Sequence, residues 1–522
     1  MDTKKELRPS FPEVILNRLR VLWPSLIDLI QFAFLIPREI LLKAVCVSYG
    51  TFLWVFRYLP PSYLAWSSRI WERRAFYHAA YRVPAYGKFL VQQGLSNKEI
   101  PETDKESYIR AFPIEERCLD GKLFLKNVMA DESSGSTGTP YDWVRSRRER
   151  EESHLTISYF ATYCFGREPL FTINAFSMGA WATGINMGMA LQKNGSVKNT
   201  GPDIQKIFHT LEFFGPGHTY LITGYPPFLK RLMDEAQDRG FPLEKFRLYA
   251  LVGGEGMSEG LRDYLLKRFQ KVFSGYGATD IEIGLAGETP LSVAIRRLAL
   301  ANPAVRKALF GDDPRLPMLF QYNPLMHHIK VNSRSELLFT VTRRSLLSPR
   351  VRYNVHDQGG VMRFDEMKKV LSGLGFELDR LVESRACGPL NLPFIWVFGR
   401  SDTTVSVMGA NIYPEDLEHC LYAEPELARI TRSFCLSVSE SAQGGVRPCF
   451  IFEIEGEPNP ELNLRFQQSI LGHMIKLNAD FREAWKEYPQ ALLPDIRLYA
   501  PGQGPFAQDQ GKIKQVRLLK KI

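Results

Sequence analysis

The chain has 522 residues, of which 45% are hydrophobic and 12% aromatic; this is enough apolar material for more than one packed domain, and it excludes a disordered chain. The formal net charge is +9, and the densest basic group, RSRRERE at 145–151, alternates with acids as is typical of the solvated face of a helix. No nucleic-acid-binding module accompanies these charges, so we expect no nucleic-acid partner; a mild positive field suits an anionic substrate, a phosphate-rich cofactor or an anionic membrane surface.

Residues 11–68 are rich in Leu, Ile, Phe and Trp, but charged residues interrupt them repeatedly. The longest uncharged run, from Ala44 to Phe56, has 13 residues, whereas a membrane-spanning helix needs about 20. No signal-peptide cleavage pattern follows the start. Two interpretations stay open: this extension packs on the main body, or it lies in a membrane interface as amphipathic helices.

We expect residues 1–68 to be dispensable for chemistry and to govern where the protein sits. The seven cysteines are odd in number and have no metal-ligand spacing, which predicts free thiols in a reducing compartment. The expected location is therefore the cytoplasm, with peripheral contact to the inner face of a membrane through residues 11–68 as the favoured role of the extension.

The stretch DESSGSTGTPY, residues 131–141, stands between an expected extended segment and an expected helix. Its glycines allow a close backbone approach, and its N–H and hydroxyl groups can hold the oxygens of an anion. It has no Walker pattern. On composition alone the stretch is either a phosphate-binding loop or a plain surface turn.

The segment from Lys245 to Gly284 predicts a βαβ unit. RLYALV and KVFSGYG have strand composition, and SEGLRDYLLKRF between them has helical spacing of apolar residues. Parallel strands would open at one sheet edge, where open α/β sheets bind ligands. That edge would carry glycines, an aromatic ring and two carboxylates, which suit a nucleotide with a metal ion; glycine-rich turns are the alternative.

Three further stretches follow. ELLFTV, at 336–341, predicts a strand, and Asp357 comes after it in RYNVHDQGG. VFGRSDTTV, from Val397, predicts a tight turn or hinge that leads into a small domain. DQGKIKQVRLLKKI places Lys512 in a loop after a glycine, close to the end of the sequence.

In this order the five stretches resemble the adenylate-forming enzyme superfamily, and they are most similar to the phenylacetate–CoA ligase family. AAYRVPAYGKFLVQQGL, from Ala79, is similar to that family's entry into the large domain. The resemblance covers roughly residues 70 to 522. It implies an α/β adenylate-forming enzyme fold, with a large domain of packed sheets and helices over 69–401 and a small, mobile α+β lid domain over 402–522. The extension, 1–68, lies outside it.

The resemblance also implies the nucleotide-binding residues. The β- and γ-phosphates of ATP would be held by the loop residues Ser133, Ser134, Gly135, Ser136, Thr137, Gly138 and Thr139. The adenine and ribose site would be formed by Gly254, Glu255, Tyr276, Gly277 and Asp357, with Asp357 on the ribose hydroxyls.

The remaining implied roles concern the reaction. Thr279 would touch the α-phosphate, and Asp280 would help to hold Mg²⁺. Arg400 would lie beside the ribose and phosphate, and Asp402 would be the hinge between the domains. Lys512 would be the catalytic lysine of adenylation, which must withdraw before a thiol can enter.

The implied function is ATP-dependent activation of a carboxylic acid to an acyl-adenylate, followed by transfer to coenzyme A. Loading of the phosphopantetheine of an acyl carrier protein is an alternative, as is a non-catalytic, membrane-associated binding protein on a degenerate ligase fold. An apolar or aromatic acid is expected because Phe176, Met178 and Trp181 in AFSMGAWATGINMGMAL would contribute to its pocket; they could also be core residues.

Four departures from the family pattern bear on the substrate more than on the reaction type. Tyr141 stands where a lysine often follows the loop, and Asp280 stands where glutamate is usual. His356 precedes the ribose aspartate at a position where glycine is usual. Residues 287–317 predict a helical insertion next to the acyl pocket.

Overall fold

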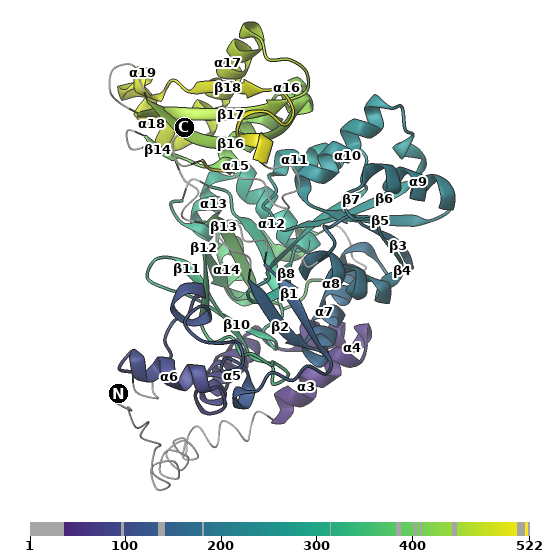
Figure 1. Cartoon of the computed structure of the whole chain (residues 1–522), viewed down its shortest axis with the longest axis vertical. Coiled ribbons are helices and arrows are strands. Elements are labelled where there is room, and N and C mark those ends of the chain that lie inside the picture. Colours follow the sequence, from purple (N-terminus) through teal and green to yellow (C-terminus); the bar gives the residue numbers. More distant parts are fainter. Residues whose placement is uncertain are drawn as a thin grey trace, which may run out of the picture.

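The computed structural model describes residues 36–95, 99–133, 141–179, 182–313, 315–382, 388–400, 405–407, 410–440, 446–508 and 517–519. Its centre is an 11-stranded sheet in the order β10-β11-β12-β13-β9-β8-β7-β6-β5-β3-β4 (Figure 1). The strands are β3 (Leu170–Asn174), β4 (Gly195–Asn199), β5 (Thr219–Gly224), β6 (Arg247–Gly253), β7 (Lys271–Ala278), β8 (Glu282–Gly287), β9 (Met318–Tyr322), β10 (His327–Val331), β11 (Glu336–Val341), β12 (Tyr353–Met362) and β13 (Phe394–Arg400).

One half of the sheet, from β4 to β7, is parallel. Its crossover helices include α9 (Ile204–Phe214), α10 (Pro226–Asp238) and α11 (Glu259–Leu265). Strands β6 and β7 pair in parallel with α11 between them, which confirms the predicted βαβ unit. The helix begins after Ser258, whose side chain accepts a hydrogen bond from the Leu261 amide, and ends earlier than its apolar spacing predicts.

The other half of the sheet, from β7 to β10, is antiparallel. The predicted strand ELLFTV is β11, in which every residue is buried. Strand β12 carries Asp357, which is paired in register with Arg400 of β13. The antiparallel pairing thus brings together the backbones of two residues that are 43 positions apart in the printed sequence.

Two paired strands flank the small-residue stretch, so a strand stands between it and the helix expected directly after it. Strands β1 (Val128–Glu132) and β2 (Asp142–Ser146) pair antiparallel, and α7 (Arg147–Phe165) follows β2. The sequence analysis missed β2 because polar residues stand at both of its ends. The prediction of a solvated face at 145–151 holds for Arg147 and Arg148 but is wrong for Arg145 and Glu149, which are buried.

The N-terminal helices α3 (Ile36–Val47), α4 (Tyr49–Tyr58) and α5 (Pro61–Arg82) pack on the large sheet domain. Phe52 and Phe56 are fully buried and share a core with aromatic residues of α7. Helix α5 runs across the boundary expected between 68 and 69. Within the part of the chain that is described, no helix is both long and apolar enough to cross a bilayer.

The predicted helical insertion consists of α12 (Pro290–Ala301) and α13 (Pro303–Phe310). These helices pack against α14 (Phe364–Gly373) in a separate apolar cluster. Val293 of α12 also packs against the apolar cluster that contains Ile157 and Phe160. Because Gly287 and Glu288 line the same cavity as those residues, the insertion begins next to it. The other helices of the large part are α6 (Pro84–Gln92) and α8 (Ala182–Leu191).

The C-terminal part has an apolar core of its own. It contains a three-stranded sheet of β16 (Thr431–Glu440), β17 (Val446–Ile454) and β18 (Asp495–Tyr499), and the short pair β14 (Val405–Val407) and β15 (Ala410–Ile412). Its helices are α15 (Pro414–Tyr422), α16 (Pro425–Ile430), α17 (Pro460–Leu477), α18 (Ala479–Glu487) and α19 (Pro489–Leu492). This part caps one end of the molecule (Figure 1). The expected hinge, Asp402, lies outside the described residues.

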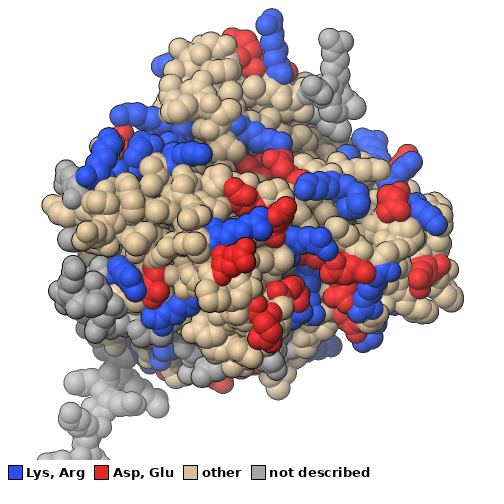
Figure 2. Space-filling model, turned by 90° about the horizontal axis from the view of Figure 1, so that it is seen from above, with Lys and Arg blue, Asp and Glu red and all other residues tan. Residues whose placement is uncertain are grey.

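Seen from that end, the surface carries Lys and Arg side chains interspersed with Asp and Glu (Figure 2). Mixed signs over a face are typical of an ordinary solvated surface. The described cysteines Cys46, Cys118, Cys164, Cys420, Cys435 and Cys449 are all free thiols, as the sequence predicts.

Candidate active site

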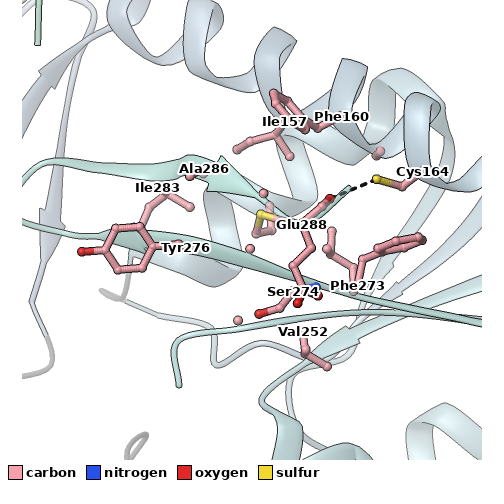
Figure 3. Close-up of a pocket in the computed structure, with 18 of the residues that line it drawn as sticks. Ile157, Phe160, Cys164, Val252, Phe273, Ser274, Tyr276, Ile283, Ala286 and Glu288 are labelled. Carbon is pink, nitrogen blue, oxygen red and sulfur yellow. Dashed lines mark hydrogen bonds between the residues drawn. The ribbon is translucent and has the colours of Figure 1, made fainter. Parts of the chain in front are cut away.

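A cavity of about 90 Å³ lies where β6, β7 and β8 meet helices α7 and α8 (Figure 3). Its wall is mostly apolar, and the side chains that form it are Ile157, Phe160, Phe165, Phe176, Met187, Leu251, Val252, Phe273, Ile283 and Ala286. Such a concave apolar chamber with a few polar groups at its edge is typical of a small-molecule site.

Glu288 is a charged residue in the wall of this cavity (Figure 3). Its carboxylate accepts hydrogen bonds from the Ser274 amide at 2.7 Å and from Arg262 Nη1 at 3.0 Å. The Cys164 thiol donates to the Glu288 backbone carbonyl at 3.3 Å. Because the charge of Glu288 is already paired within the protein, the chamber favours an apolar group rather than a cation.

Tyr276 joins the cavity to the expected ribose residue. The ring lines the cavity and lies 5.7 Å from the Phe320 ring, and its hydroxyl donates to Asp357 Oδ2 at 2.7 Å. Burial and the adjacent Asp357 carboxylate raise the pKa of Tyr276 well above its ordinary value, so the hydroxyl remains a donor. Two residues expected at the adenine and ribose are thus in direct contact.

Two glycines at this edge stand where neighbouring atoms leave no space for a side chain. Gly254 has φ +85°, and a side chain there would collide with the Tyr225 ring. At Gly277 a Cβ atom would lie 2.7 Å from the Glu282 carbonyl oxygen. The Tyr225 ring and the Glu282 backbone therefore pack so closely on these two positions that only glycine fits.

His356 adopts φ +64°, in the left-handed region that favours glycine. Its amide donates to Asn354 Oδ1 at 2.7 Å, and its ring Nδ1 lies 3.4 Å from Glu336 Oε1. This conformation explains why glycine is usual at the position, and the local hydrogen bonds offset the strain of a side chain.

Thr279 and Asp280 lie in the turn after β7. Arg145 of β2 connects this turn to the β1–β2 pair. Arg145 donates to the Ile281 carbonyl at 3.2 Å and to Asp131 Oδ2 at 2.9 Å. The Asp280 carboxylate accepts a hydrogen bond from the Tyr353 hydroxyl at 2.9 Å. The sequence analysis missed Arg145. Residues two apart on a strand share a face, so the position of Arg145 two residues after Trp143 on β2 could have indicated that it is buried.

Ser133 stands at the base of the loop. The Tyr141 amide donates to Ser133 Oγ at 3.0 Å, and Lys105 Nζ lies 3.5 Å from the same oxygen. Arg117 Nη2 donates to the Tyr141 hydroxyl at 2.5 Å. The sequence analysis did not single out Lys105 and Arg117, which contact Ser133 and Tyr141 at the two ends of the small-residue stretch. Ser134 to Thr139 lie outside the described ranges.

The C-terminal part reaches the same edge of the sheet. Arg517 Nη2 lies 3.6 Å from Glu255 Oε2, and the Ser258 amide donates to Glu418 Oε2 at 3.0 Å. Lys512 lies outside the described residues.

The other expected site residues are placed as follows. Phe176 lines the cavity, with its ring edge against Tyr225. Met178 is absent from the cavity wall and packs beside Gly184 and Gly201. Trp181 lies outside the described residues. For Arg400 the structure gives the backbone pairing with Asp357.

Among the residues described, no group of three or more His, Cys, Asp or Glu side chains could hold a metal ion. The resemblance does not imply a site made of protein ligands alone. Mg²⁺ usually binds through one or two carboxylates together with substrate phosphates. Asp280, half-buried at the rim, fits that arrangement.

The sequence matches no protein-family model and no curated protein sequence. Solved structures do match. 2-Hydroxyisobutyryl-CoA ligase in the postadenylation state, in complex with R3-HIB-AMP, has a TM-score of 0.63 and 11% identity over 88% of this chain and 90% of that chain. The chain has the adenylate-forming enzyme fold.

The same ligase in the thioesterification state, in complex with 2-HIB-AMP and CoA, has a TM-score of 0.51 and 12% identity over 89% of this chain and 91% of that chain. The structural similarity is thus greater to the postadenylation state than to the thioesterification state. The predicted fold class is confirmed.

Proposed function

We propose that this protein activates an apolar or aromatic carboxylic acid with ATP and transfers the acyl group to the thiol of coenzyme A. The observation that carries the proposal is a junction at one sheet edge: the Tyr276–Asp357 hydrogen bond adjoins the apolar chamber. A nucleotide on one side of Tyr276 and an acyl group on the other would meet at the acid's carboxylate.

In the first step a carboxylate oxygen of the acid attacks the α-phosphorus of ATP. The new C–O–P linkage gives the acyl-adenylate, and the bond to pyrophosphate breaks. Lys105, Arg117 and the loop after Ser133 would neutralise charge on the leaving pyrophosphate, and Lys512 would serve the reacting oxygens. When bound with ATP, Mg²⁺ would screen phosphate charge beside Asp280.

In the second step the thiol attacks the acyl carbonyl, loses its proton and releases AMP. Lys512 cannot occupy the site while the thiol enters, so the C-terminal part must rotate between the steps, with Asp402 as the proposed hinge. The greater similarity to the postadenylation state than to the thioesterification state of a ligase with this fold supports an arrangement suited to the first step.

The size of the chamber supports a compact acid. The cavity of about 90 Å³ is smaller than the roughly 150 Å³ of an apolar protein cavity that binds benzene. It therefore favours a short branched chain or, with small shifts of the wall, a single aromatic ring over a long fatty acyl chain.

Exchange of labelled pyrophosphate into ATP, screened over acids of increasing length, tests the proposal. We expect exchange that depends on an added acid and is strongest for ring-sized acids. Exchange that is equal with and without every acid would contradict the proposal, as would a preference for long-chain fatty acids over compact ones.

A further inference from the structure

A second cavity lies between α5 and the segment that follows β11. It encloses about 20 Å³ and is lined by Trp71, Arg74 and His78 of α5 and by Arg343 and Arg344 after β11. It shares no lining residue with the acyl chamber. Helix α5 lies at the end of the large part away from the C-terminal part (Figure 1), so this is a separate site.

The cavity collects positive charge without a carboxylate in its wall. In the described part of the chain, the structure records no hydrogen bond or ion pair for Arg74 or Arg344. Arg343 also lines the cavity but is paired with Glu282 and Glu152. Burial, together with the charge of Arg344, lowers the pKa of Arg74 although the charge of Glu39 opposes the shift, as expected for a cation without a bonded counter-ion.

The indole of Trp71 adds a hydrogen-bond donor. The guanidinium carbons of Arg38 and Arg74 lie over its ring, 4.0 Å and 4.4 Å from the ring centroid. The buried Trp71 Nε1 has no acceptor among the described residues. Arg38 is itself fully buried, and its Nη2 donates to Thr342 Oγ1 at 2.7 Å. Glu39 lies 3.7 Å from Arg38 Nη1 but does not line the cavity. The buried indole N–H near Arg74 is therefore a suitable environment for an anion.

We propose that this cavity binds a phosphomonoester group, supplied by inorganic phosphate in solution or by the headgroup of a phosphomonoester lipid. Two unpaired guanidinium groups match a dianion, and arginine is suited to bidentate contacts with phosphate oxygens. The enclosed volume of about 20 Å³ holds only one or two atoms of water size. It can therefore receive phosphate oxygens, whereas the rest of the ligand would lie outside, next to the exposed Arg344.

Exposed side chains of α3, which carries Arg38 over Trp71, and of the next helix, α4, favour a lipid as the source. Ile40 and Val47 of α3 are 61% and 76% exposed, and Trp54 and Tyr58 of α4 are 58% and 70% exposed. Exposed aromatic and aliphatic side chains of this kind are typical of helices that enter a membrane interface. Such contacts would add to headgroup binding but would not contribute to binding of free phosphate.

The test compares a double variant, R74Q/R344Q, with the control R147Q/R148Q. Both remove two arginines, but the control pair is exposed on α7 and ion-paired with Glu151 and Glu152. Calorimetric titration with inorganic phosphate should show at least a 10-fold loss of affinity in R74Q/R344Q and less than a 2-fold change in the control. Trp71→Phe, which keeps the stacked ring, should lose roughly 3-fold.

A second arm uses vesicles of phosphatidylcholine that contain phosphatidic acid or, as a phosphodiester of lower charge, phosphatidylglycerol. Co-sedimentation that prefers phosphatidic acid and is lost in R74Q/R344Q assigns the site to a lipid; phosphate binding without such co-sedimentation assigns it to phosphate in solution. If the double variant and the control bind both ligands equally, the proposal is wrong. Pyrophosphate exchange should be unchanged in R74Q/R344Q, so the outcome is independent of the proposed function.

Discussion

Asp357→Ala should weaken ATP binding by removing the carboxylate expected on the ribose hydroxyls. In the wild type this carboxylate accepts a hydrogen bond from the Tyr276 hydroxyl at 2.7 Å. Loss of paired charge-assisted hydrogen bonds to the ribose should cost about 2–4 kcal/mol, which corresponds to roughly a 30- to 700-fold weaker affinity. The Tyr276 hydroxyl also loses its acceptor, so thermal stability should fall as well.

The apparent KM for ATP in pyrophosphate exchange and direct calorimetric binding of ATP both measure this loss. Asp365→Ala is the matched control, because Asp365 is an exposed aspartate on α14 that pairs with Arg363 at 2.8 Å. Asp357→Asn should have an intermediate effect, because the amide oxygen can still accept from Tyr276. An ATP affinity that is unchanged in Asp357→Ala would refute the placement of the ribose.

Lys512→Ala should reduce adenylation by several orders of magnitude and leave thioester formation from supplied acyl-adenylate largely intact; equal losses in both half-reactions would contradict the two-state arrangement. Burial alone would raise the pKa of Glu282, but Arg343 and a histidine partner lower it to about 2 from an ordinary 4.5. The Glu282–Arg343 ion pair should therefore stabilise the fold fully above about pH 5. Roughly 3 kcal/mol of the free energy of unfolding should be lost as the pH falls towards 2. Denaturant unfolding at pH 7 and pH 3 should show most of this loss in the wild type and a smaller one in Glu282→Gln; equal losses in the two proteins would argue against it. Deletion of residues 1–35 should preserve exchange, whereas deletion of residues 1–68 should yield unstable protein because it removes fully buried side chains of α4; a stable and active 1–68 deletion would show that α3 and α4 are not part of the core.

The meeting of Gly254 and Tyr276 at one sheet edge was predictable from sequence because these residues follow or end strands of a βαβ unit. Gly254 and Tyr276 come at the ends of parallel strands, and the topology alone brings them to one edge. The positive φ of His356 could not be predicted from histidine itself. The only sign of it was that glycine is usual at this position in the family that the sequence resembles.

Features formed by segments far apart in the chain were not predictable. The contacts of Arg145 with Asp131 and Ile281 depend on how the hairpin docks on the sheet, and its charge alone suggested a solvated position. The wall of the acyl chamber comes partly from α7, whose helical pattern gave no sign that Ile157 and Phe160 face a ligand space. The N-terminal helices were likewise ambiguous, since the same apolar stripes serve for packing and for a membrane interface.

The most direct test of the central claim is to detect the intermediate itself. The protein would be incubated with ATP, Mg²⁺ and a compact aromatic acid, without coenzyme A, and the bound small molecules analysed by mass spectrometry before and after coenzyme A is added. The proposed function predicts an acyl-adenylate that accumulates in the first sample and is replaced by acyl-CoA and AMP in the second. Bound ATP that stays intact with every acid tested, in protein that binds ATP through Asp357, would contradict it.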